Sequence, residues 1–312
     1  IRKFFLPIAK NKESLDLRND AAHIQGKENM VVSSDMMVEG RHFERSDDPI
    51  NLAKKLLRVN LSDIAAMGAI PYGYILNLSL PKKNHDSWLK KFSYGLKVDS
   101  KKYNIKLFGG DLSSSKNIFL SLTIFGIVSK KFHKNTIAYE DSEIFVSGNI
   151  GDAGIGLKIK KEKNKNINKS LQKFFLKKFY LPKPQLQIGK SLIGISDFCK
   201  DISDGLIKEI KYISEISKLQ SHIFLSQIPL SNQLKKVLIK SKHKKKMWEY
   251  ILTTGEDYQL LFSIAKKNKK FLKKKNLKNI TKIGFFKKGD GVKIYDNNNK
   301  ILNFSRDGFS HF

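Results

Sequence analysis

The sequence predicts a mixed α/β protein with two domains. In both halves of the chain, short apolar runs alternate with segments whose apolar residues recur at helical spacing, as in α/β folds. The length of 312 residues suits two domains of about 100–200 residues each, and 40% hydrophobic residues suffice for two cores. Because the regular pattern breaks around residues 130–142, we expect one domain at residues 1–138 and another at residues 139–312.

Four strands and two long helices are expected in the first half, after a short helix near residues 1–9. Apolar or alternating runs predict the strands at residues 30–34, 72–80, 106–108 and 118–128. Asp48-Pro49 is typical of a helix start, and the apolar spacing carries this helix to Asp63. The second helix is expected at residues 88–101, with its apolar side chains on one face.

The second half repeats the alternation of strands and helices. Strands are expected at residues 143–147, 198–202, 221–225 and 258–264, with two short ones near the end. Helices are expected after the glycine-rich segment 148–156, at 185–193, after Gly205, up to about residue 252, and near the C-terminus. Residues 160–169 are rich in Lys and Asn and are expected to form a loop.

The net charge of +30 allows two interpretations. Nucleic-acid or membrane-surface binding is the functional one. The other is a compositional drift towards Lys on all solvated faces, with weak attraction to polyanions as a by-product. Lysines are spread along the whole chain and are seldom interleaved with aromatic residues, which favours drift. We therefore expect no specific nucleic-acid partner, and keep a basic nucleic-acid-binding protein as the alternative from another class.

Several sequence features indicate a cytoplasmic protein. The chain contains no apolar run of about 18 residues and no secretory signal pattern, so we expect no membrane span. The single cysteine, Cys199, excludes an internal disulfide and fits a reducing compartment. The chain begins at Ile1 instead of Met, so further N-terminal residues are expected.

Carboxylates recur where the expected strands and helices end. Asp35 and Asp111 follow apolar strands. Asp201 and Asp204 flank the end of the strand expected at residues 198–202. Asp63 stands beside a run of small residues, and Asp20 also precedes two alanines. Each alone could be a turn residue or a helix cap, and Asp63 could be a cap or a buried pair. A cluster of such acids would repel itself unless cations neutralised it, and Mg²⁺ is the natural partner of oxygen ligands.

Phosphate-binding motifs of the usual kinds are absent from the sequence. Gly189-Lys190-Ser191 resembles the end of a P-loop, but position 184 is Pro, so the motif fails. The segment 148–156 could present backbone amides to a phosphate at a helix start, or could be a tight turn between a strand and a helix. Both interpretations remain open from the sequence. The seven histidines and one cysteine show no zinc spacing.

Eight short segments occur in a fixed order along the chain: Asn19-Asp-Ala-Ala22, Ser33-Ser-Asp35, Glu39-Gly-Arg-His-Phe43, Asn60-Leu-Ser-Asp-Ile-Ala-Ala-Met-Gly-Ala69, Gly109-Gly-Asp111, Gly148-Asn-Ile-Gly-Asp152, Asp201-Ile-Ser-Asp-Gly205 and Gly255-Glu-Asp-Tyr258. Taken together, they resemble the thiamine-monophosphate kinase family over nearly the whole chain. The resemblance implies the two-domain fold of aminoimidazole ribonucleotide synthetase, with an N-terminal ATP- and magnesium-binding domain. It also implies a homodimer that pairs through the sheets of the N-terminal domains.

The resemblance implies that the γ-phosphoryl group of ATP passes to thiamine monophosphate, giving thiamine diphosphate and ADP. The implied magnesium ligands are Asp20, Ser33, Ser34, Asp35, Asp63, Asp111, Asp201 and Asp204. The implied catalytic residues are Asp63, Asp111 and Asp204, and the implied ATP contacts are Gly110, Asp111, Ser203 and, in place of an arginine, Lys134. The implied contacts to the thiamine end are His42, Glu256 and Phe309.

The residues themselves are compatible with that chemistry. The acceptor is already an ionised phosphate, so the reaction needs charge cancellation and alignment more than a strong base. The thiazolium of the acceptor is a cation, which suits Glu256 and the ring of Phe309. Simpler alternatives are a locally hydrogen-bonded turn histidine for His42, a helix-start acid or ion-pair partner for Glu256, and a packed tail aromatic for Phe309.

The sequence also departs from the family pattern. Asn19 replaces an acidic residue, which changes the ligand set beside Asp20, and Lys134 lacks the two-pronged guanidinium of arginine. The second alternative is an ATP-dependent enzyme of the same superfamily that acts on another substrate, such as a purine intermediate, and the segments with His42 and Glu256 argue against it.

Overall fold

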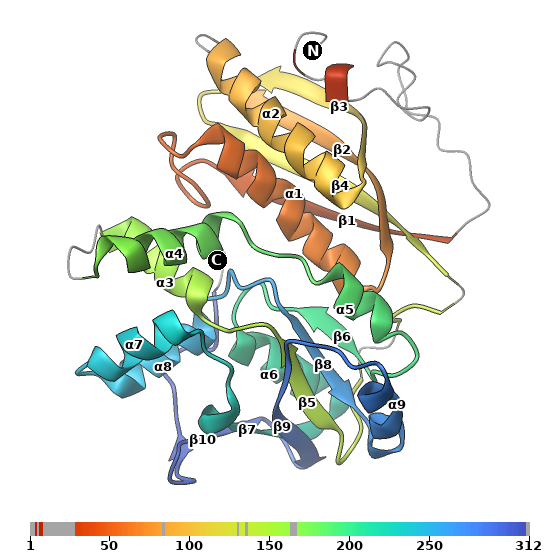
Figure 1. The fold of residues 1–312 in the computed structure, drawn as a ribbon, viewed down its shortest axis with the longest axis vertical. Coiled ribbons are helices and arrows are strands. Elements are labelled where there is room, and N and C mark those ends of the chain that lie inside the picture. The colour runs from red at the N-terminus through yellow and green to blue at the C-terminus, as the bar shows by residue number, and fades with distance from the viewer. Residues whose placement is uncertain are drawn as a thin grey trace. The chain divides into compact units, whose positions relative to one another are not determined.

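The chain divides into two compact units in a computed structural model (Figure 1). The structure describes residues 4, 6–8, 29–82, 85–129, 131–134, 137–162 and 167–309. Residues 1–64 and 69–130 form the first unit, and residues 65–68 and 131–312 form the second. Asp20 lies outside the described residues. No helix in the described part of the chain has both the length and the apolar character needed to cross a bilayer.

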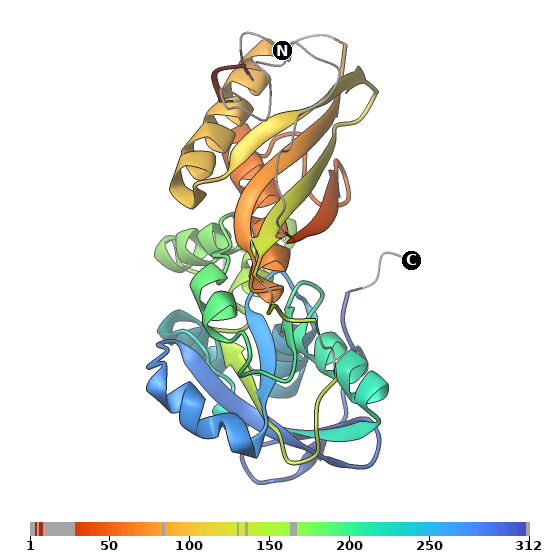
Figure 2. The same ribbon diagram turned by 90° about the vertical axis from the view of Figure 1, so that its right-hand side faces the viewer.

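In its described residues, the first unit contains a four-stranded sheet in the order β1-β4-β2-β3. Strand β4 runs antiparallel to both β1 and β2, and β3 runs parallel to β2. Both long helices lie on one face of the sheet (Figure 2), and a 3-10 helix at Leu6–Ile8 precedes them. The bounds are β1 Asn29–Val38, α1 Pro49–Ala66, β2 Ile70–Leu80, α2 Asp86–Tyr103, β3 Lys106–Ser114 and β4 Phe119–Val128.

Helical spacing of apolar residues explains how the first unit packs. Leu52, Leu56 and Leu57 on α1 are fully buried, as are Phe92 and Leu96 on α2. Between the helices, the guanidinium of Arg58 donates two hydrogen bonds to the carboxylate of Asp99 at 2.5 and 3.0 Å.

Two strands of the first unit are longer than the sequence predicts. The prediction that Asp35 ends its strand is wrong, because β1 continues to Val38. Asp111 likewise lies inside β3, which continues to Ser114. Asp35 points to the face of β1 that packs on α1, whereas the side chain of Asp111 is exposed, and both strands keep pairing with their neighbours beyond these residues. Polar side chains after an apolar run therefore did not mark the strand ends here.

The second unit is a seven-stranded sheet in the order β11-β10-β7-β9-β5-β8-β6. The strands are β5 Glu143–Ser147, β6 Cys199–Asp201, β7 Leu219–Phe224, β8 Leu260–Ile264, β9 Ile280–Lys288, β10 Val292–Tyr295 and β11 Ile301–Leu302. The helices are α3 Asp152–Glu162, α4 Lys169–Tyr180, α5 Leu186–Ser191, α6 Leu206–Ser217, α7 Asn232–Lys240, α8 Lys244–Thr253 and α9 Lys269–Lys274, with 3-10 turns at Leu225–Gln227 and Lys266–Asn268.

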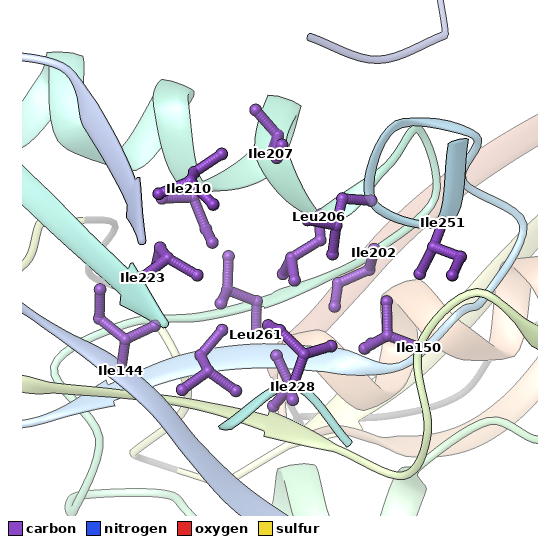
Figure 3. Packing of buried hydrophobic residues seen from close by; sticks show 14 of the residues in the cluster. Ile144, Ile150, Ile202, Leu206, Ile207, Ile210, Ile223, Ile228, Ile251 and Leu261 are labelled. Atoms are coloured by element: carbon purple, nitrogen blue, oxygen red, sulfur yellow. The ribbon is translucent and has the colours of Figure 1, made fainter. Parts of the chain in front are cut away.

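The central residues of β5 and the residues of β8 are buried on both faces of the sheet, which explains why apolar residues stand at consecutive positions in each strand. Ile144 and Leu261 contribute to a large core with Leu206 and Ile210 of α6 (Figure 3). Phe145 and Phe262 stack at 5.5 Å in a second cluster on other residues of the same strands. Successive side chains of a strand point to opposite faces, so one strand serves two cores.

Helix α4 was not predicted from the sequence. Its start is capped by the side chain of Asn168, whose oxygen accepts a hydrogen bond from the amide of Leu171 at 2.9 Å. Phe175 and Phe179 are its buried residues. The surrounding lysines masked this narrow apolar stripe in the sequence.

Candidate active site

Two carboxylates of the first unit lie close to each other. Asp35 comes from β1 and Asp63 from α1, and the hydroxyl of Ser33 donates a hydrogen bond to Oδ2 of Asp63 at 2.5 Å. The backbone amide of Asp35 donates to Oδ1 of Asn60 at 3.2 Å, which ties the strand to the helix. Burial and the neighbouring charge of Asp63 raise the pKa of Asp35 to about 7. The pair is therefore electrostatically strained, and a bound cation would relieve it.

Strand alternation separates Ser34 from this pair. Ser33 and Asp35 point to one face of β1, whereas Ser34 points to the other. The hydroxyl of Ser34 lies 3.0 Å from Oγ1 of Thr123 and 3.3 Å from the carbonyl oxygen of Leu122. The structure does not bring the Ser34 side chain to the carboxylate pair.

Gly110 and Asp111 lie on the edge strand β3, beside β2. Gly110 has φ +149°, and a Cβ atom there would lie 1.7 Å from the carbonyl oxygen of Leu76, so only glycine fits. The amide of Asp111 donates to Oδ1 of Asn77 at 3.0 Å, and its side chain is exposed. In the described part of the chain, no three His, Cys, Asp or Glu side chains form a group that could hold a metal. Among the described residues of the first unit, Asp35 and Asp63 form a carboxylate pair.

His42 lies in the turn that follows β1. Its Nδ1 accepts a hydrogen bond from the amide of Val38 at 2.9 Å, so this nitrogen carries no proton. The guanidinium of Arg45 binds Glu39 with two hydrogen bonds at 2.7 and 2.9 Å, and Glu39 also accepts from the amide of Ile118. These contacts fix the turn that presents the His42 ring.

In the second unit, three segments that are far apart in the sequence meet at the end of β6. The amide of Glu256 donates to the carbonyl oxygen of Ser203 at 2.8 Å. The amide of Phe309 donates to the carbonyl oxygen of Asp204 at 2.9 Å. Asp201, the last residue of β6, is buried. The backbones of Ser203, Asp204, Glu256 and Phe309 therefore lie together, in the segments that follow Asp201 at the end of β6.

Two side chains that the sequence analysis missed hold the C-terminal segment on this site. Nζ of Lys208 donates to Oδ2 of Asp204 at 2.5 Å and to the carbonyl oxygen of Phe309 at 2.7 Å. Oε1 of Glu249 accepts from the backbone amides of Ser305 and Arg306. The spacing of Asp204 and Lys208 by one helical turn was a usable signal, whereas nothing in the sequence pointed to Glu249.

The glycine-rich segment after β5 is a tight turn and offers no phosphate cradle at its centre. The amide of Gly148 donates to Asn279, and that of Ile150 donates to Pro229. The amide of Gly151 donates to Oδ2 of the buried Asp257 at 2.8 Å. These amides are already satisfied inside the protein, which decides between the two interpretations of this segment.

Lys134 is exposed and follows a buried anchor. Nε2 of His133 lies 2.8 Å from the carbonyl oxygen of Gly189, and burial lowers the pKa of His133. A Cβ atom on Gly189 would lie 1.9 Å from the carbonyl oxygen of Ala65. The glycine of the false P-loop thus serves close backbone packing of helix α5, as expected for a helix.

Comparison with known proteins gives consistent results. The family described as AIR synthase related protein, N-terminal domain, matches residues 18–128. The thiamine-monophosphate kinase of Buchnera aphidicola subsp. Acyrthosiphon pisum is 35% identical, covering 100% of this chain and 97% of that protein. The thiamine-monophosphate kinase structure from Stenotrophomonas maltophilia K279a has a TM-score of 0.80 and 28% identity, covering 93% of each chain. AaThiL complexed with AMPPCP and TMP has a TM-score of 0.79 and 28% identity, covering 93% of this chain and 90% of its own.

These similarities extend over both units and include the segments that carry Asp63, Asp204 and Glu256. A relative at 35% identity that aligns with the whole chain is sufficient to assign the family. The protein belongs to the thiamine-monophosphate kinase family.

Proposed function

We propose that this protein transfers the γ-phosphoryl group of ATP to thiamine monophosphate, giving thiamine diphosphate and ADP. The observation that carries the proposal is the full-length similarity to thiamine-monophosphate kinases, at 35% identity in the Buchnera protein. The similar AaThiL structure holds AMPPCP, an ATP analogue, together with TMP. The same function explains why Asp63, Asp204 and Glu256 stand where they do.

We assign Asp63, Asp111 and Asp204 as the catalytic residues. The acceptor phosphate is ionised near neutral pH, so no strong base has to remove a proton from it. The obstacle is repulsion between two polyanions, and catalysis consists of cancelling that charge and aligning the reactants. Carboxylates perform this task through a divalent cation, because alone they would add to the repulsion.

Magnesium fits the residues that are present. The pKa of Asp35 is raised to about 7 by burial and by Asp63, which indicates a site that lacks positive charge. All proposed donors are oxygen atoms, which Mg²⁺ prefers. When bound, the ion would neutralise phosphate charge. The residues that would hold several such ions are Asp20, Ser33, Asp35, Asp63, Asp111, Asp201 and Asp204. Ser34 is left out of this set, because its hydroxyl points to the other face of β1.

ATP contacts are assigned to both units of the chain. Gly110 lets the backbone pass close to Leu76, so Asp111 is presented at a fixed position on the edge strand. Ser203 lies in the turn after β6, and its carbonyl oxygen is held by Glu256. Lys134 provides a point charge for the phosphates, without the paired donors of an arginine.

His42, Glu256 and Phe309 are assigned to the thiamine end. The carboxylate of Glu256 and the ring face of Phe309 are both suited to a thiazolium cation. Their backbones are joined through Ser203 and Asp204, which supports a common role in the second unit. His42 belongs to the first unit, where its turn is braced by Glu39 and Arg45.

A homodimer is part of the proposal, with the first unit as the pairing domain. The two long helices leave one face of this sheet uncovered (Figure 2). Val32 (58% exposed) and Met36 (56%) alternate along β1 with Ser33 and Asp35, so they point away from α1. Both are on β1, on the same face as Phe119 of β4. A second copy would bury this face. Met36→Glu should convert a dimer into a monomer in light scattering, and an unchanged mass would contradict this interface.

Turnover tests the function directly. The protein is incubated with Mg-ATP and thiamine monophosphate, and thiamine diphosphate is measured. We expect product with the wild type, none with Asp63→Asn or Asp111→Asn, and normal turnover with the control Asp290→Asn, whose side chain is exposed. Turnover of a purine precursor in place of thiamine monophosphate would refute the proposal, as would full activity of both aspartate variants.

A further inference from the structure

Asp257 is a buried carboxylate in the loop that carries Glu256. Its side chain accepts a hydrogen bond from the amide of Gly151 at 2.8 Å, and the amide of Ala153 also binds it. These amides form the start of helix α3, where the aligned backbone dipoles favour a negative group. Asp257 therefore caps α3 from a loop more than a hundred positions away in the sequence. It ties the turn after β5 to the loop before β8.

The backbone on both sides of Asp257 is in an unfavourable conformation. Glu256 has φ +67° and Tyr258 has φ +48°. These values lie in the left-handed region, which residues other than Gly, Asn and Asp rarely adopt. Such conformations persist only where the surroundings hold them. The Glu256 backbone would relax towards other conformations if its anchors were removed.

Two sets of anchors hold this loop. The amides of Glu256 and Tyr258 donate to the carbonyl oxygens of Ser203 and Ile202 at 2.8 and 2.9 Å. These bonds secure the loop to the turn after β6. The carboxylate of Asp257 makes its bonds to α3 instead. Glu256 is thus held between the turn after β6 and the start of α3.

We propose that Asp257 is a positioning residue for the thiamine site. It does not touch the substrate. By capping α3, it fixes the left-handed backbone that presents the carboxylate of Glu256 to the cationic end of the acceptor. This inference rests on the proposed function, because it assigns Asp257 a part in binding thiamine monophosphate.

Asp197 offers a matched control in the same unit. It is also a buried aspartate, and its Oδ2 accepts from the hydroxyl of Ser263 at 2.8 Å. Its hydrogen-bond partners include Ser142 and the amide of Ala265, and none of them belongs to the loop at 255–258. Removing either carboxylate should destabilise the fold, but only the loss of Asp257 should disturb Glu256.

The experiment compares Michaelis constants in the full-length enzyme. We expect Asp257→Ala to raise the KM for thiamine monophosphate about tenfold, with the KM for ATP changed less than about twofold. Asp257→Asn keeps an oxygen that can accept from Gly151, so its KM for thiamine monophosphate should stay within about threefold of wild type. Asp197→Ala should lower the melting temperature and leave both KM values unchanged.

Asp257→Glu keeps the carboxyl group but adds a methylene, so it should push the loop away from α3 and raise the same KM. This variant takes the place of Asp257→Ala in the comparison of KM values if the alanine variant does not fold. An unchanged KM for thiamine monophosphate in folded Asp257→Ala or Asp257→Glu would overturn the inference, as would equal effects on both substrates. Wild-type turnover is measured in parallel, so a missing activity counts against the proposed function, whereas an unchanged KM in an active enzyme counts against Asp257 alone.

Discussion

The replacement Asp63→Asn should abolish activity and at the same time stabilise the metal-free protein. In the wild type, Asp35 and Asp63 repel each other, and this repulsion contributes to the rise in the pKa of Asp35. Asparagine removes the charge and keeps an oxygen that can accept from the hydroxyl of Ser33, which now donates to Asp63 at 2.5 Å. The variant therefore loses a metal ligand and a source of electrostatic strain together.

The size of the gain follows from the pKa. A rise in the pKa of Asp35 from 3.8 to about 7 is equivalent to about 4 kcal/mol, at about 1.4 kcal/mol per pKa unit. Burial is the larger cause, so the charge of Asp63 accounts for less than half of this, at most about 2 kcal/mol. We expect Asp63→Asn to gain about 1 kcal/mol above pH 7, or about 4 °C in melting temperature.

The sign of the pH dependence is fixed by the same group. The folded protein binds the proton of Asp35 more tightly than the unfolded chain does. This group therefore lowers the free energy of unfolding as the pH rises from 3.8 to about 7. At pH 5.5, Asp35 is protonated in the folded wild type and the repulsion is absent. The advantage of Asp63→Asn should therefore be present at pH 8 and disappear at pH 5.5.

The assay is thermal unfolding in EDTA at both pH values, with turnover measured separately. Asp111→Asn is the control, because Asp111 is exposed on the edge strand and its loss should abolish activity without raising the melting temperature. Added Mg²⁺ should stabilise the wild type more than Asp63→Asn, because ligand binding to the folded state raises stability. A variant that is less stable than wild type in EDTA at pH 8, or that remains active, would refute the reasoning.

Three further predictions concern the nucleotide, the sheet and the acceptor. Lys134→Arg should lower the KM for ATP about threefold through paired hydrogen bonds to phosphate, and a higher KM would show that Lys134 does not face the nucleotide. Gly110→Ala should cost more than about 2 kcal/mol in urea unfolding, because its Cβ would lie 1.7 Å from the carbonyl oxygen of Leu76, and a stable variant would contradict that packing. Glu256→Gln should raise the KM for thiamine monophosphate at least about fivefold and leave that for ATP unchanged, and equal changes in both would argue against its contact with the cation.

The sequence by itself determined the fold class and the family. Local spacing was enough for helices such as α1, whose leucines recur on one face, and for strand β8, which is apolar except for Ser263. The spread of the lysines along the chain favours compositional drift as the origin of the net charge of +30, and this interpretation stays a prediction. Local patterns failed where polar residues sit inside paired edge strands, at Asp35 and Asp111.

Only the tertiary structure decided which of the predicted residues meet. Asp35 and Asp63 face each other because β1 packs on α1, and Glu256 and Phe309 join the turn after β6 through backbone hydrogen bonds. No local pattern marks a backbone amide as occupied, so the capping of α3 by Asp257 was invisible in the sequence. Contacts between distant segments depend on the packing of whole elements, whereas sequence periodicity reports only which side of one element is buried.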